Sequence, residues 1–148
     1  MKWSTIALCV CIALGLLSLG LMVSGQTYDY QASIVALRTE DGTAATQFKS
    51  GQFVFVDVQL TNIMTYTSAS QAYLVVVRAT YSQTLYGLAA FSGSMTPGQQ
   101  LEVIPAFEVP SNAPVGTYDI QVMVFTTWPS NGGYPIAASV TTTFAVVP

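Results

Sequence analysis

Residues 116–127, GTYDIQVMVFTT, decide the fold. Every second residue from Tyr118 to Val124 is apolar, so these side chains share one face of an extended strand. Residues 52–62, QFVFVDVQLTN, repeat the pattern with a row of valines and a leucine. Period-two alternation of β-branched and aromatic residues is typical of strands that bury one face. The two stretches therefore predict an all-β domain.

Working outward from these stretches, the sequence predicts seven strands, separated by segments rich in Gly, Pro, Ser and Asn. They cover residues 28–38, 52–62, 71–80, 84–91, 99–109, 116–127 and 136–147. Pro105 interrupts the fifth strand and favours an edge or a bulge there. Residues 39–49 are expected to form a turn and a polar link. Seven short strands with turns between them predict an antiparallel sandwich of two sheets.

The first 25 residues have the layout of a secretory signal peptide or N-terminal hydrophobic signal helix. Lys2 precedes an almost wholly apolar run, residues 6–23, and short residues precede a cleavage point before Gln26. A run of about 18 apolar residues also borders on the length that spans a bilayer, so an uncleaved membrane anchor is the alternative. The expected organisation is therefore a signal peptide or anchor, 1–25, and a β-sandwich domain, 26–148, located outside the cell or at its surface.

Composition excludes several functions. The chain is 51% hydrophobic and only 7% charged, with a formal net charge of −3, so it has too few basic residues to bind nucleic acid. It has no histidine, and Cys9 and Cys11 both lie in the N-terminal run. The usual nucleophile–base pairs and zinc ligand sets are therefore missing, and we predict no catalytic residue and no enzyme activity.

Calcium is the one metal that the carboxylates suggest. Glu40 and Asp41 could share an ion with Asp29 or Asp57, but the spacing matches no calcium-binding loop. Asp41-Gly42 also fits a hairpin turn, which is the favoured interpretation. The sequence thus predicts no cofactor and no metal site.

The second half of the chain has a recognisable order of short motifs. Residues 96–100 (TPGQQ) precede a strand, residues 107–118 (FEVPSNAPVGTY) lead into another, and a strand that begins after Gly51 ends in Thr61-Asn62. Residues 50–148 resemble the immunoglobulin-like and adhesion-type sandwich domains of secreted archaeal and bacterial surface proteins. The resemblance implies an immunoglobulin-like β-sandwich and no active site, since the fold is a general scaffold. From the residues themselves we expect the ring of Tyr118 to be buried beside a chain reversal at Gly116.

The leading functional hypothesis is a secreted structural or adhesive protein, a self-assembling subunit of an extracellular filament or surface layer. The expected partner is another copy of the chain, joined by β-strand addition as in some archaeal and bacterial surface fibres. The first strand could pair with a neighbouring subunit, or it could be the first strand of its own sandwich. The candidate interface residues lie on this strand and on the apolar second faces of two others: Tyr28, Tyr30, Ile34, Phe53, Phe55 and Met123.

Two other hypotheses remain open. The first is a binding module that recognises carbohydrate or peptide through residues 128–135, with Trp128, Tyr134 and Phe125 as the contact residues. The alternative for these aromatic rings is packing on the edge of the core. The second hypothesis is an accessory subunit that an uncleaved N-terminal segment tethers to a membrane.

Overall fold

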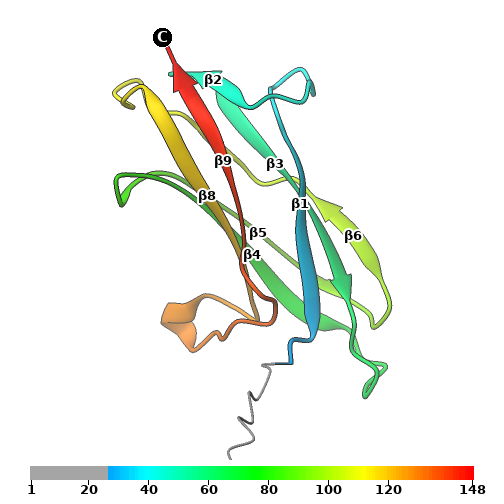
Figure 1. Cartoon of the computed structure of the whole chain (residues 1–148). Coiled ribbons are helices and arrows are strands. Elements are labelled where there is room, and N and C mark those ends of the chain that lie inside the picture. Colours follow the sequence, from blue (N-terminus) through cyan, green and yellow to red (C-terminus); the bar gives the residue numbers. More distant parts are fainter. Residues whose placement is uncertain (1–26) are drawn as a thin grey trace, which may run out of the picture.

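The computed structural model describes residues 27–148, which form two packed β-sheets (Figure 1). The expected signal segment, residues 1–25, lies outside the described residues. Within these described residues, one 3₁₀ turn, Pro129–Asn131, is the only element that is not a strand. The strands are β1 (Tyr30–Arg38), β2 (Gln47–Lys49), β3 (Phe53–Asn62), β4 (Gln71–Tyr81), β5 (Thr84–Met95), β6 (Gln100–Val103), β7 (Ala106–Glu108), β8 (Gly116–Phe125) and β9 (Val140–Val147).

The sheets differ in width. The narrower sheet has the order β1-β3-β6, and β7 pairs with β3 further along. The wider sheet has the order β2-β9-β8-β4-β5. Every pairing is antiparallel except that of β2 with β9. The predicted two-sheet sandwich is therefore confirmed, and β1 and β5 each lie at an edge of a sheet.

The alternating rows form the core as predicted. On β3 the row from Val54 to Leu60 is fully buried, and so is the row of β8 that begins at Tyr118. The Tyr118 ring stacks on Phe144 at a centroid distance of 5.2 Å, and its hydroxyl donates a hydrogen bond to the Pro114 carbonyl at 2.8 Å. This bond ties the loop before β8 to the core, which confirms the expected corner.

Several element bounds differ from the prediction. The expected polar link contains β2, whose single apolar residue, Phe48, is fully buried; one apolar residue between two polar ones gives no periodic signal. The strand expected over residues 99–109 is two strands, because Pro105 has no N–H to donate. The strand expected from residue 136 begins at Val140, since the backbone of Ile136 bonds to both sheets, at Val124 and Tyr30.

The structure contains one buried carboxylate that the alternation pattern does not explain. Asp57 is fully buried on β3 although its neighbours Val56 and Val58 face the core. Its side chain forms an ion pair with Arg38 of β1, whose side chain is 38% exposed. Arg38 also donates from Nη1 to the Gly42 carbonyl at 3.0 Å, so the same side chain braces the turn after β1. The second carboxylate oxygen, Oδ1, has no hydrogen-bond partner among the described residues.

Candidate functional site

The outer edge of β5 is the longest unprotected strand edge of the sandwich. β4 pairs with one side of β5, and no strand of residues 27–148 pairs with the other. The strand TLYGLAAFSGSM contains no charged residue and no proline. Natural sheets usually protect an edge with charges, proline or bulges, because its free N–H and C=O groups can pair with another chain. A bulge does occur near the start of β5, and the strand is regular from Gly87 onward.

Apolar side chains accompany this edge. Leu85, Leu88 and Phe91 are 53%, 54% and 43% exposed. Gly87 is required by the packing beneath, since a Cβ there would lie 2.3 Å from Cδ2 of Phe107. Together these residues give the β5 edge an uncharged surface with a regular, accessible backbone, which suits main-chain pairing with another strand.

A lateral groove runs between the edge of β1, in the narrower sheet, and the edge of β9, in the wider sheet. The groove has a volume of about 360 Å³ and is lined by residues 33–37 of β1, residues 140–143 of β9, and Ala45 and Thr46. Backbone hydrogen bonds close both ends, from Tyr30 N to Ile136 O and from Ala45 N to Leu37 O, each 2.9 Å long. These closures hold β1 in place, so a strand from another molecule has less access here than at β5.

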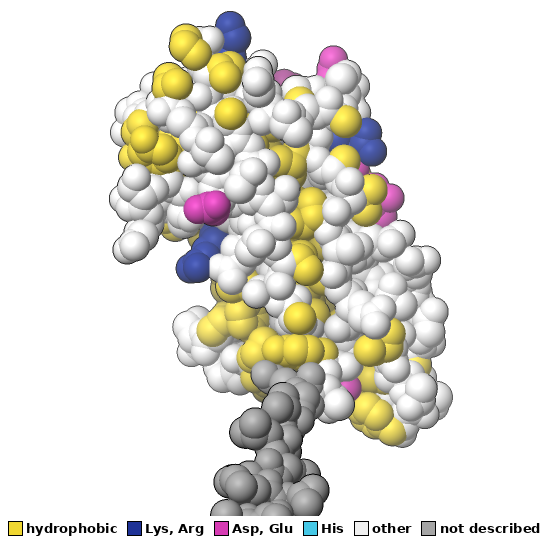
Figure 2. All heavy atoms as spheres, viewed as in Figure 1, with side chains coloured by type: hydrophobic (Ala, Val, Ile, Leu, Met, Phe, Trp, Pro, Cys, Tyr) yellow, Lys and Arg dark blue, Asp and Glu magenta, His cyan; other side chains and the backbone are white. Residues whose placement is uncertain are grey.

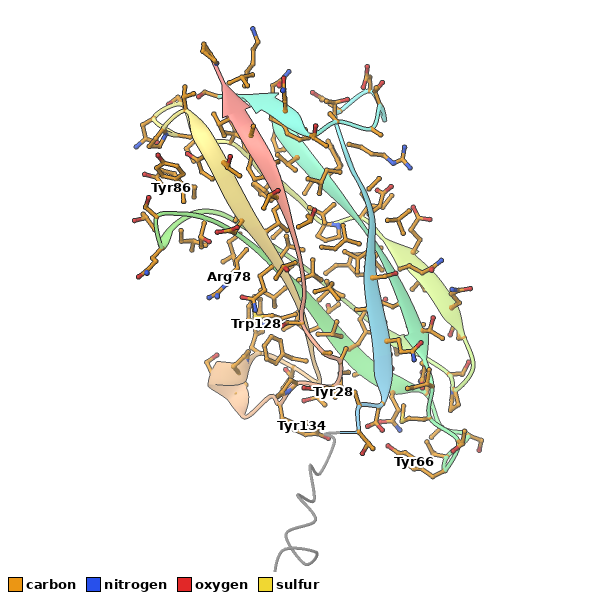
Figure 3. All side chains as sticks on the ribbon, viewed as in Figure 1. Tyr28, Tyr66, Arg78, Tyr86, Trp128 and Tyr134 are labelled. Carbon is orange, nitrogen blue, oxygen red and sulfur yellow. The ribbon has the colours of Figure 1, made fainter. Side chains whose placement is uncertain are left out.

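Four aromatic side chains lie on the part of the sandwich nearest residue 27, which we call the aromatic end: Tyr28, Tyr66 and Tyr134 at its tip, and Trp128 further along the side, next to Arg78 (Figure 3). Tyr66 is 72% exposed, Tyr134 61% and Trp128 43%, whereas Tyr28 is half-buried. In Figure 2 apolar side chains surround the point where residues 1–26 join the domain, and the Lys and Arg side chains in view lie elsewhere.

Hydrogen bonds hold the aromatic end in shape. The Tyr66 hydroxyl donates to the Asp29 carboxylate at 2.8 Å, and this bond raises the pKa of Tyr66. The Trp128 carbonyl accepts from the backbone N–H groups of Asn131 and Gly133, and Tyr134 bonds through its backbone to Thr126. The loop that carries Trp128 and Tyr134 is therefore braced by hydrogen bonds of its backbone, and both side chains are exposed.

The predicted assembly residues have different environments. Tyr30 and Ile34 face the sandwich's own core: Tyr30 is 2% exposed, and its hydroxyl donates to the Gln71 carbonyl at 3.1 Å. Both side chains lie inside the sandwich because β1 pairs with β3 over residues 30–38, and their role in assembly stays a prediction. Phe53 is 40% exposed and lies 6.3 Å from the half-buried ring of Phe55.

On the outer face of the wider sheet, apolar side chains of neighbouring strands lie beside one another and are partly shielded from solvent. Met123 and Phe125 are half-buried beside Val76 and Leu74 of β4, which are 6% and 5% exposed. Of the predicted binding residues, Phe125 is thus half-buried in the sheet, whereas Trp128 and Tyr134 are exposed. Sequence analysis did not identify the β5 edge, although the absence of charge and proline over residues 84–95 is visible in the sequence.

Three of the four carboxylates that could share a calcium ion have other partners, since Asp29 accepts from Tyr66, Asp57 pairs with Arg38, and Asp41 is held in its turn. Asp41 accepts hydrogen bonds from the Thr39 hydroxyl and from the Thr43 N–H, and the bond from Thr39 is the main reason that the pKa of Asp41 is lowered. Gly42 has φ = 83° and completes this turn, as predicted. Residues 27–148 contain no cluster of three candidate metal ligands. Nor does this part of the chain contain a helix long and apolar enough to cross a membrane.

Compared by sequence, the chain matches no protein-family model and no curated protein. Its fold is similar to segments of much larger proteins. A glycosyl hydrolase family 2 member from Bacteroides cellulosilyticus is 12% identical with a TM-score of 0.58, and the match covers 81% of this chain and 16% of that one. A β-glucosidase from Listeria innocua is 9% identical with a TM-score of 0.55, covering 82% and 16%.

Native α-2-macroglobulin from Escherichia coli gives a TM-score of 0.50 at 16% identity, covering 82% of this chain and 17% of that one. This chain therefore spans less than a fifth of the length of each of these proteins. At such identities the likeness concerns the fold alone, and the hydrolase and macroglobulin functions do not transfer with it. The chain is an immunoglobulin-like β-sandwich.

Proposed function

We propose that this protein is a non-catalytic structural subunit of an extracellular assembly, a filament or surface layer, in which copies of the chain join by β-strand addition. The β5 edge carries the proposal. It supplies an accessible row of main-chain donors and acceptors with no charge or proline to prevent pairing. The N-terminal signal-like sequence supports an extracellular location.

Pairing of two β5 strands around a two-fold axis would join two five-stranded sheets into one continuous sheet. Such an interface is self-complementary and closes on a dimer, because the same strand serves both subunits. A second contact, outside β5, would then join these dimers into a filament or layer. Small residues dominate the regular part of the strand, Gly87–Met95, so two backbones can approach closely. The exposed Leu88 and Phe91 side chains would then lose contact with water. We therefore propose β5, in place of β1, as the joining strand.

The experiment is electron microscopy and light scattering of the full chain, expressed with its N-terminal segment and concentrated in neutral buffer. Ala90→Lys places a charge in the middle of β5 and should abolish assembly. Thr117→Lys is the matched control, because Thr117 is also exposed but lies on β8, an interior strand of the same sheet. Monomers of the unchanged chain at every concentration would contradict the proposed function. Assembly of the Ala90→Lys variant would contradict the role of β5.

A further inference from the structure

The aromatic end lies where the domain continues into residues 1–26 (Figures 1 and 3). Its rings come from three separate segments: the residues before β1, the loop after β3, and the loop after β8. Ile63 adds a 41% exposed aliphatic side chain to the same end, and its N–H bonds to the Asp29 carbonyl at 2.9 Å. Convergence of these loops gives the end an amphipathic surface of phenol, indole and aliphatic groups.

Tyr and Trp are enriched where proteins meet the boundary between water and lipid, because the rings are apolar and carry one polar group. The hydroxyl of Tyr66 is already held by Asp29, and the exposed rings of Tyr134 and Trp128 are braced by backbone bonds. Of the three basic residues of the described chain, Arg38 and Lys49 end β1 and β2 at the opposite end, and Arg78 of β4 is the one that lies near Trp128 (Figure 3). The surface therefore suits the headgroup level of a bilayer through its aromatic rings more than through charge attraction.

The sequence on the other side of Tyr28 limits how far a bilayer could be from these rings. Residues 6–23 form the apolar run, and only residues 24–27 separate it from Tyr28. Five Cα–Cα steps join Val23 to Tyr28, and a fully extended chain of that length reaches about 18 Å at most. If the apolar run spans a bilayer, the aromatic end must lie at or next to the lipid headgroups.

We propose that the aromatic end is the lipid-facing end of this protein, with Tyr66, Trp128 and Tyr134 at the headgroup level of the bilayer that residues 6–23 enter. The strands run lengthwise from this end to the opposite one (Figure 1). The β5 edge then faces sideways along the membrane, where a neighbouring tethered copy would meet it. The lipid contact goes beyond the proposed function and does not depend on strand addition.

The test uses the full chain with Trp3→Phe, which leaves Trp128 as the single tryptophan. The protein is reconstituted into phosphatidylcholine–phosphatidylglycerol vesicles whose acyl chains carry bromine at shallow positions. We expect the protein to float with the vesicles. Trp128 emission should shift to shorter wavelength and lose intensity in brominated vesicles relative to unbrominated ones.

The matched control moves the probe to the opposite end of β3. Phe53→Trp, combined with Trp3→Phe and Trp128→Phe, places the single tryptophan at a position that is 40% exposed, against 43% for Trp128. Its emission should not depend on bromine. Equal quenching of both probes, quenching of neither, or failure of the chain to float would overturn the proposal, as would a Trp128 response only to added soluble oligosaccharide. Microscopy of the same samples reports assembly separately, so failure of lipid contact and failure of strand addition are distinguishable.

Discussion

Replacing Arg38 with methionine should strongly destabilise the fold, because it leaves the buried carboxylate of Asp57 without its positive partner. Asp57 is fully buried, and Arg38 is the partner in the single ion pair among residues 27–148. Oδ1 of Asp57 already has no hydrogen-bond partner among these residues, so the carboxylate depends on Arg38 at the other oxygen. Methionine preserves much of the aliphatic packing of arginine, so the change mainly removes the charge.

Breaking a buried ion pair by removing one partner typically costs about 3–5 kcal/mol. The Arg38 side chain is 38% exposed, so water can enter the space that the guanidinium leaves. We therefore expect the lower end of that range, about 3 kcal/mol. With a urea m-value of about 2 kcal/mol/M, the unfolding midpoint should fall by about 1.5 M.

The assay is urea unfolding followed by circular dichroism, with Arg78→Met as the matched control. Arg78 is exposed on β4 and makes no ion pair within residues 27–148, so its replacement should leave the midpoint nearly unchanged. The double variant Arg38→Met/Asp57→Leu removes both charges and should recover most of the lost stability, since apolar replacement of a whole buried pair is often neutral. A midpoint for Arg38→Met equal to that of the control would refute the reasoning.

Tyr118→Phe should lower the free energy of unfolding by about 1–1.5 kcal/mol, because the Pro114 carbonyl loses its hydrogen bond; an unchanged urea midpoint would contradict this. Gln83→Gly should raise the free energy of unfolding by about 0.5–1 kcal/mol, because Gln83 has φ = 66° in the turn between β4 and β5. The same urea unfolding measures this change, and a loss of stability would contradict the prediction. Burial raises the pKa of Tyr30, Tyr73 and Tyr118, so the folded state holds these protons more tightly than the unfolded state. The stabilisation that these protonated tyrosines give the folded state is fully present below pH about 10 and should fall as the pH rises further. Titration of tyrosinate absorbance alongside the denaturant midpoint checks this. A constant midpoint up to pH 11 would contradict it.

The stretches of alternating apolar and polar residues predicted most of the sandwich, because the alternation shows which side chains of each strand are buried. The row from Tyr118 to Val124 and the row from Val54 to Leu60 are core positions in the structure. The turn at Asp41-Gly42 and the corner at Tyr118 were also predictable, since each depends on residues close together in the chain. Local conformation and the inward face of a strand are properties that a short window of sequence can encode.

The sandwich type, the core rows and the local turns were therefore determined by the sequence by itself. Only the tertiary structure decided that Phe48 belongs to a parallel strand, that Asp57 is buried against Arg38, and that β5 ends the wider sheet with a free edge. It also decided that two distant loops bring Tyr66, Trp128 and Tyr134 toward the end that continues into the apolar run. The physical reason is that sheet edges, ion pairs and surface clusters depend on which segments become neighbours in space. The pattern of residues within one segment does not specify which segments those are.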